Sequence, residues 1–190
     1  MALGHRLDTA STIEFSAFWA GQSTGTLVLN QPGMALVGAT NPDFMNLTSF
    51  DSKLRSQSWS TEVNLVHLFK DGTDDALRLA VFGGFRTINF KESFAIDTVS
   101  PTATGTYFNR AENQLYGGQL GVKGTVREVL PRVNVDFVAD VGLFGNQMFH
   151  SATLDSTNAA RMHMTDSPSA MSALVGGSVE VAYQMRPGMQ

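Results

Sequence analysis

Apolar and polar residues alternate along much of this chain of 190 residues. Alternation with a period of two is typical of β-strands, because successive side chains of a strand point to opposite faces of the sheet. Six segments carry the pattern most clearly, and we expect each of them to form a strand: residues 11–20, 58–69, 76–90, 112–127, 132–146 and 172–186.

The connections between these segments alternate in length. Three are long and rich in Ser, Thr, Asn, Asp and Gly (21–57, 91–111 and 147–171), and two are short (70–75 and 128–131). Short turns at one end and long loops at the other are typical of an outer-membrane β-barrel. The predicted fold is therefore all-β, an antiparallel up-and-down transmembrane β-barrel that forms a single domain over residues 1–190.

Six strands are fewer than the eight of the smallest single-chain bacterial barrels. Two interpretations stay open: the barrel is incomplete in this chain, or one or two strands lack clear alternation. Residues 25–30 and 34–40, within the first long connection, are candidates for such strands.

The two faces of a predicted strand differ in polarity. In segment 132–146, Val133, Val135, Phe137, Ala139, Val141 and Leu143 alternate with Asn134, Asp136, Val138, Asp140 and Gly142. In a membrane barrel the apolar set faces lipid and the other set faces the lumen. Applied to all strands, this rule predicts a set of lumen-lining side chains: Glu62, Arg78, Arg86, Gln119, Lys123, Asp136, Asp140, Glu180 and Gln184.

Aromatic residues bracket the predicted membrane segment. Trp59 and Phe69 are ten positions apart, which is about 33 Å along a strand, or about 24 Å of height when the strand is tilted by roughly 45°. This height is close to the ~25 Å apolar band of outer-membrane barrels, which aromatic girdles flank. The residues expected in the girdles are Trp59, Phe69, Tyr116 and Tyr183.

Alternation also fits a soluble antiparallel sheet with one face in water. In that alternative the chain is a soluble β-barrel that binds an apolar ligand in its interior. Val135, Phe137 and Val141 would then lie in the core, and Asp136 and Asp140 would face water. The unequal lengths of the connections favour the membrane barrel.

Composition excludes several other classes of protein. A net charge of -4 and a pI near 5.5 provide no basic field, so we expect no nucleic-acid partner. No run of eighteen apolar residues predicts a transmembrane helix. The absence of cysteine excludes disulfides and thiolate metal sites, and the four histidines show no ligand spacing, so neither a metal nor a cofactor is expected.

No arrangement of nucleophile, base and oxyanion donors emerges from the pattern, and we expect no enzyme. Asp136 and Asp140 would lie about 13 Å apart along a strand, too far for a carboxylate pair of the glycosidase kind. Ser60 and His67 are separated by an odd number of positions, which puts them on opposite faces.

Three stretches carry a resemblance to a known family: 52–65 (SKLRSQSWSTEVNL), 77–90 (LRLAVFGGFRTINF) and 113–121 (NQLYGGQLG). They resemble the planctomycete-type β-barrel porin-like outer-membrane proteins, which are similar to the Legionella-type pore-forming outer-membrane proteins. In these families a strand ending in Gly-Gly-Phe-Arg precedes a long loop, and an asparagine, a Tyr-Gly motif and Gln-Leu-Gly follow. Residues 83–86 and 113–121 keep this order.

The resemblance covers about residues 52–146. It implies a barrel in the bacterial outer membrane, in contact with lipid, that either lets small polar solutes pass or has a structural role in the envelope. It supplies no catalytic residue. The sequence lacks the apolar segment of a secretory signal and the terminal aromatic residue of a complete member, so we expect a fragment of a larger barrel.

Overall fold

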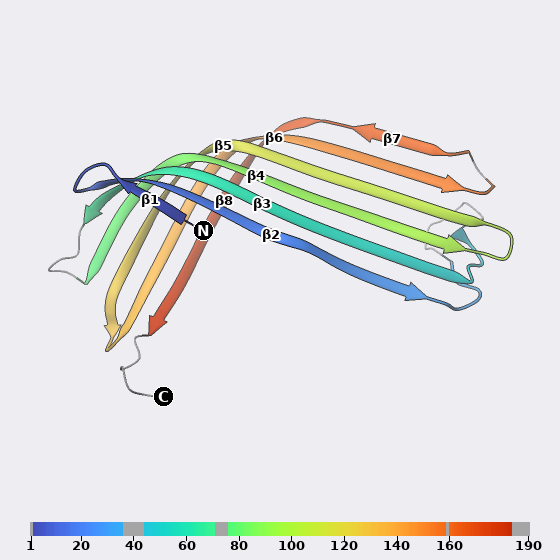
Figure 1. The fold of residues 1–190 in the computed structure, drawn as a ribbon, viewed down its shortest axis with the longest axis horizontal. Coiled ribbons are helices and arrows are strands. Elements are labelled where there is room, and N and C mark those ends of the chain that lie inside the picture. Colours follow the sequence, from blue (N-terminus) through green and yellow to red (C-terminus); the bar gives the residue numbers. More distant parts are fainter. Residues whose placement is uncertain (1, 36–43, 71–75, 159, 184–190) are drawn as a thin grey trace.

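The computed structural model describes residues 2–35, 44–70, 76–158 and 160–183. Their fold is all-β, a single antiparallel up-and-down sheet of eight strands (Figure 1). The strands are β1 (Ala2–Arg6), β2 (Ser11–Leu29), β3 (Ser49–Lys70), β4 (Leu77–Val99), β5 (Thr104–Leu130), β6 (Val133–Ser156), β7 (Met162–Asp166) and β8 (Ser169–Tyr183).

Neighbours in sequence are neighbours in the sheet from β1 to β7, and β8 pairs with β6. β7 pairs with residues 150–154 of β6, and β8 pairs with residues 133–147 of the same strand. β7 and β8 therefore follow one another along one side of β6. Among the described residues, one edge of the sheet is formed by β1 and, beyond its paired residues 12–16, by β2, and the other edge by β7 with β8.

All six predicted strands are found, as parts of β2, β3, β4, β5, β6 and β8, and residues 184–186 of the last one lie outside the described residues. The short connection between β5 and β6 is also confirmed and consists of residues 131–132. The pattern of alternation did not predict β1 or β7. Of the two additional strands suggested within the first long connection, residues 25–29 are the end of β2, whereas most of 34–40 lies outside the described residues.

The predicted loops 91–111 and 147–171 are wrong for most of their length. Residues 91–99 and 104–111 extend β4 and β5, and most of 147–171 belongs to β6, β7 and β8. The first predicted loop, 21–57, shrinks to the connection 30–48. These extensions carry Ser, Thr, Asn and charged residues on both faces, as strands in water do, and therefore lack the simple alternation of a half-apolar strand.

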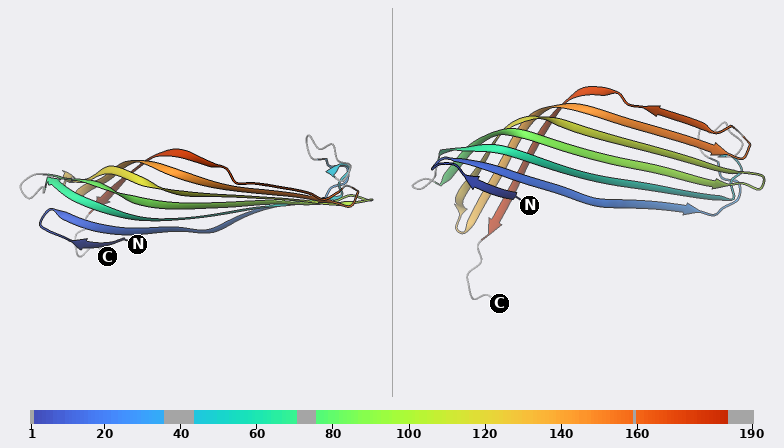
Figure 2. Two further views of the ribbon diagram at one scale, coloured as in Figure 1. Left: turned by 90° about the horizontal axis from the view of Figure 1, so that it is seen from above. Right: turned by 45° about the horizontal axis from the view of Figure 1, so that its top comes forward.

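The sheet is strongly curved in the half that ends at the β5–β6 turn, which we call the curved half (Figures 1 and 2). It is flatter toward its other end, and we call that part the extended half. An ion pair identifies the concave side of the curved half. Lys123 Nζ of β5 lies 2.6 Å from Glu14 Oε1 of β2, with β3 and β4 between the two strands. Neighbouring strands are about 4.8 Å apart, so side chains from β2 and β5 meet only where the sheet folds toward them.

Glycines permit this curvature by removing side chains from the concave face. A Cβ atom at Gly84 would overlap the backbone oxygen of Val63 and the side chain of Asn64. On the opposite, convex face, a Cβ at Gly118 would find its nearest neighbour at 3.8 Å. Close approach of strands thus requires glycine at position 84 but not at 118.

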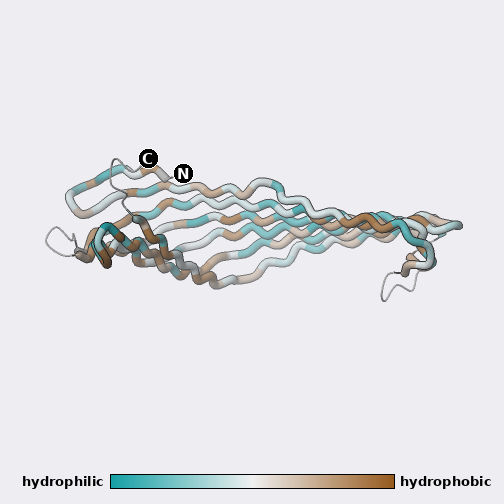
Figure 3. The backbone as a smooth tube through the Cα atoms, turned by 90° about the horizontal axis from the view of Figure 1, so that it is seen from below, coloured by the Kyte–Doolittle hydropathy of each residue, from teal (hydrophilic) through white to brown (hydrophobic). Residues whose placement is uncertain are grey.

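A small apolar cluster lies on the concave face near the β3–β4 end. Val66, Ala80 and Phe82 are buried, and Leu68 and Val138 pack against them. Polar and apolar positions alternate along most strands (Figure 3), and this cluster makes the concave face apolar near the β3–β4 end.

Gly84→Ala should destabilise the sheet because the added methyl group overlaps Val63 and Asn64. We expect the free energy of unfolding to fall by about 1–3 kcal/mol, as for other overpacked sites. The matched change Gly118→Ala should shift it by no more than about 0.5 kcal/mol. Urea unfolding followed by tryptophan fluorescence measures both, and equal effects of the two changes would contradict the proposed reason for the curvature.

Candidate functional site: the concave polar face

Eight of the nine side chains predicted to line a lumen share the concave face. Residues paired across neighbouring strands point to the same side of a sheet, and the register pairs Glu62 with Arg86, and Arg78 with Thr125, Asp136 and Glu180 in turn. Gln119 and Lys123 lie an even number of positions from Thr125 along β5, and Asp140 lies four positions from Asp136 along β6, so all three point to the same side. Gln184 lies outside the described residues. That these side chains line a lumen stays a prediction.

The centre of this face is a hydrogen-bonded network around Glu62. Ser16 Oγ donates to Glu62 Oε1 at 2.6 Å, and Gln119 Nε2 donates to Glu62 Oε2 at 2.8 Å and to Asn64 Oδ1 at 2.9 Å. Gln119 spans β4 to reach β3, across the space that Gly84 leaves open. Only 4% of Gln119 is exposed, so this amide is a fixed part of the face.

Arg86 completes the network from β4. Its Nε donates to Ser60 Oγ at 3.0 Å and lies 4.0 Å from Glu62 Oε2. The predicted set did not include Ser16, Ser60 and Asn64. Ser60 and Asn64 lie two positions from Glu62 on β3, and Ser16 pairs with Glu62. Alternation along each strand could have found them, because neutral polar residues share a face with the charged residues two positions away.

A second group of charges lies nearer the turn end of the strands. Lys123 Nζ donates to both carboxylate oxygens of Glu14 at 2.6 Å, and the Thr125 hydroxyl donates to Asp136. Together with Arg78 these side chains line a hollow of about 330 Å³, whose remaining wall is partly apolar. Glu14 was missing from the predicted set, although it alternates with Ile13 and Phe15 along its strand.

The convex face of the curved half has the opposite character. Its apolar side chains are exposed, with 86% of Val175, 68% of Leu120 and 64% of Leu143 accessible. The same face carries further exposed apolar side chains from five strands: Ile13, Phe15, Val63, Leu65, Val81, Phe85, Val141, Val179 and Val181. We refer to this surface as the apolar band.

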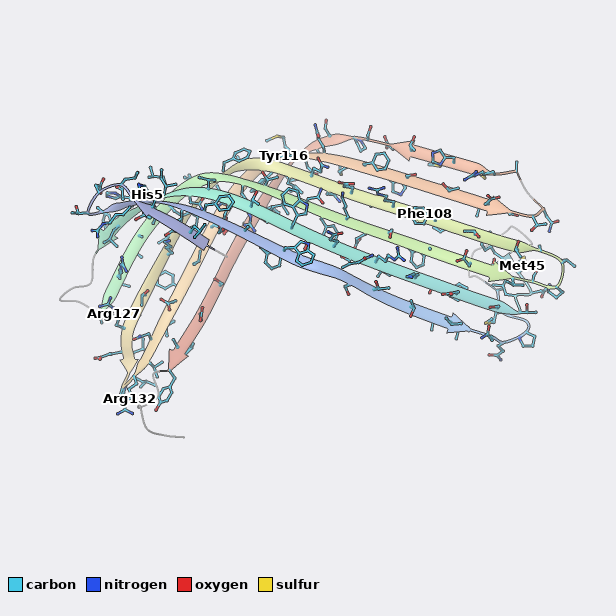
Figure 4. The ribbon with its side chains drawn as sticks, viewed as in Figure 1. His5, Met45, Phe108, Tyr116, Arg127 and Arg132 are labelled. Carbon is cyan, nitrogen blue, oxygen red and sulfur yellow. The ribbon has the colours of Figure 1, made fainter. Side chains whose placement is uncertain are left out.

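Aromatic side chains lie at both limits of the apolar band. Trp59 is paired in register with Trp19 of β2, and Tyr116 lies at the same limit on β5, where Figure 4 labels it. Phe69 and Tyr183 lie toward the turn end of their strands and are exposed. Trp19 was not among the predicted girdle residues. The membrane role of all these residues stays a prediction.

A third polar cluster lies on the convex face just beyond the Trp59 limit. Glu112 Oε1 accepts hydrogen bonds from Asn89 Nδ2, Gln114 Nε2 and Lys91 Nζ, each at 3.0 Å, and Arg110 lies 3.2 Å from Oε2. Burial alone would raise the pKa of Glu112, but the bonds from Gln114 and Asn89 and the bond and charge of Lys91 lower it to about 2. Glu112 is therefore ionised at neutral pH.

In the described residues, no three His, Asp or Glu side chains are grouped closely enough to hold a metal ion. Residues 2–35, 44–70, 76–158 and 160–183 contain no helix with the length and hydropathy that a membrane-spanning helix requires. No model of a known protein family matches the sequence, and no curated protein matches it.

Stability should depend on pH through Glu112. Because its folded pKa lies below its ordinary value of 4.5, its contribution is present above about pH 4.5 and is lost as the pH falls toward 2. Glu112→Gln should lower the free energy of unfolding by about 2 kcal/mol at pH 7, with a smaller difference from the native protein at pH 2.

Denaturant unfolding at a series of pH values measures this difference. Glu92→Gln provides the control, because the described residues offer Glu92 neither a hydrogen bond nor an ion pair. If the native protein and Glu112→Gln differ by the same amount at every pH, the depressed pKa does not stabilise the fold.

Proposed function

We propose that this chain forms the wall of a porin-like β-barrel in the bacterial outer membrane and acts without enzymatic activity. Its concave face would line a water-filled passage for small polar solutes. The observation that carries the proposal is the opposite polarity of the two faces in the curved half: charged and amide side chains on the concave side, exposed apolar side chains on the convex side.

The dimensions of the apolar band support contact with lipid. The segment from Trp59 to Phe69 corresponds to about 24 Å of height at a tilt of roughly 45°, close to the apolar band of known barrels. Large contiguous apolar surfaces are rare on soluble monomers. Strands β4 and β5 continue well beyond the band, so they would project from the membrane on the side opposite the short turns.

Selectivity would come from the width of the passage and from the charges on its wall. Glu14, Lys123, Arg78 and Asp136 place both signs of charge on the concave face near the turn end. Charged walls of this kind select ions by electrostatic barriers. In the bilayer both edges of the sheet need partners, so the proposal requires strands that pair with the β1–β2 edge and with the β7–β8 edge.

A closed barrel with a structural role in the envelope is the second candidate. The pairing of Glu14 with Lys123 and of Glu62 with Arg86 favours it, because paired charges can fill a narrow interior. The alternative of a soluble β-barrel would need Val135, Phe137 and Val141 in its interior, whereas the register places them on the convex face. The exposed convex band argues against that alternative.

The face of β6 that contacts lipid can be determined with single cysteines, since the chain has none of its own. In vesicles containing lipid-borne quenchers, a fluorophore at Val135→Cys or Phe137→Cys should be quenched, because these positions share the convex parity. Fluorophores at Asp136→Cys and Val138→Cys should not be. Absence of quenching at all four positions, with the protein remaining in solution without detergent, would favour the soluble alternative.

Conductance in planar bilayers separates a pore from a closed barrel. We expect discrete channel steps, and we expect Lys123→Glu to shift the ion selectivity toward cations because it reverses a charge on the wall of the passage. Lys53→Glu makes the same change on the convex face and should leave the selectivity unchanged. A protein that inserts but gives no steps would exclude the pore and leave the structural role.

A further inference from the structure

A basic hollow lies on the convex face of the extended half. It has a volume of about 230 Å³, and its wall includes the cations Arg55, Lys91 and Arg110 together with Gln57 and Phe108. The register explains how it forms: Ser93 of β4 is paired with Arg55 on one side and with Arg110 on the other. The small serine side chain leaves room between the two guanidinium groups.

The hollow keeps a net positive charge. Glu112 holds Lys91 and Arg110 at 3.0 and 3.2 Å, yet 42% and 48% of these two side chains remain exposed. Arg55 has no ion-pair partner among the described residues and is exposed. Glu92 also lines the hollow, but its parity places its side chain on the opposite face. Three cations against one carboxylate leave an excess of two positive charges.

The hollow lies just beyond the aromatic residues that limit the apolar band. Arg55 precedes Trp59 by four residues on the same face of β3, which is about 13 Å along the strand, or about 9 Å of height at a tilt of roughly 45°. Lys91 is nearer, two residues beyond Asn89, the partner of Trp59. Figure 4 shows the two ends of the region on β5, Tyr116 at the limit and Phe108 beyond it.

The phosphate groups of a bilayer lie in the region just beyond the aromatic limit of the apolar band. The polar headgroup layer adds about 5–8 Å to each side of the hydrocarbon core, and interfacial aromatic side chains mark where that layer begins. Arginine binds phosphate through two parallel N–H···O bonds, and lysine adds a compact point charge. Lys91 and Arg110, held in place by Glu112, therefore lose little side-chain entropy on binding.

We propose that Arg55, Lys91 and Arg110 form a binding site for the phosphate group of a membrane lipid, on the side of the membrane from which the long strands project. This inference rests on the proposed membrane function, because it requires lipid around the apolar band. The phosphate oxygens accept hydrogen bonds from the three cations, while the acyl chains of the same lipid lie against the band below Trp19 and Trp59.

The two tryptophans of the chain provide the probe. Both lie at the limit of the band next to the hollow, and the sequence contains no others. The full-length protein is reconstituted in phosphatidylcholine vesicles that contain a minor fraction of acyl-brominated lipid, either phosphatidate or phosphatidylcholine. Brominated phosphatidylcholine reports contact with lipid as such, and any excess quenching by brominated phosphatidate reports enrichment of the phosphate-bearing lipid beside the hollow.

We expect brominated phosphatidate to quench the native protein more strongly, with an apparent relative affinity about tenfold above that for phosphatidylcholine, as one charge-assisted contact of about 1.4 kcal/mol would give. Arg55→Gln and Arg110→Gln should remove most of this excess. Lys53→Gln removes one positive charge from the same face outside the hollow and should keep it. Quenching by brominated phosphatidylcholine should be the same in all four proteins.

Each other outcome overturns part of the proposal. Equal quenching by the two lipids, or equal loss in Lys53→Gln and Arg55→Gln, would exclude a specific site and leave only general attraction between charges. Abolition of the excess by inorganic phosphate in the buffer would show a phosphate site that does not select the lipid. If neither brominated lipid quenches the native protein, the membrane function fails first, and the lipid site fails with it.

Discussion

The curvature of the sheet depends on side chains that meet across strands which are not neighbours. Lys123 of β5 reaches Glu14 of β2 across two strands, and Gln119 of β5 reaches Glu62 and Asn64 of β3 across one. Such contacts exist only on a concave face. The contacts made by Lys123 and Gln119 are polar, whereas Val138 of β6 packs against the apolar cluster of β3 and β4 across β5. Where the concave face is polar, the alternation of a strand puts its apolar side chains on the convex face.

The polarity of the two faces changes along β4. In the curved half of β4, Val81 and Phe85 are convex and Arg86 is concave. Farther along the same strand, Phe94 and Ile96 have the concave parity, and Lys91 has the convex one. A single strand thus passes through two environments, and the convex face changes from apolar to charged just beyond Trp59. The Glu112 cluster lies at this change, where a buried carboxylate orients cations at the border of the apolar band.

Sequence alone could predict the curved half because its alternation is strong and local. Six strands, and the common face of eight of the nine residues predicted to line a lumen, followed from alternation within single strands. The extended half could not be predicted in this way, because its polar side chains occur on both faces and the alternation changes near Phe90. β7 was not predicted for a related reason. All residues of Met162–Asp166 are exposed, so neither face of this strand needs to be apolar and its sequence does not alternate.

The polar clusters required knowledge that no single strand contains. Glu112 meets Lys91 only because residue 112 of β5 is paired with residue 91 of β4, and a shift of register by one residue would put them on opposite faces. The same register brings Arg55 and Arg110 to either side of Ser93. Parity predicts which face a residue occupies, whereas register decides which residues meet on that face. Clusters built from three strands, such as the basic hollow, therefore become visible only when the whole sheet is assembled.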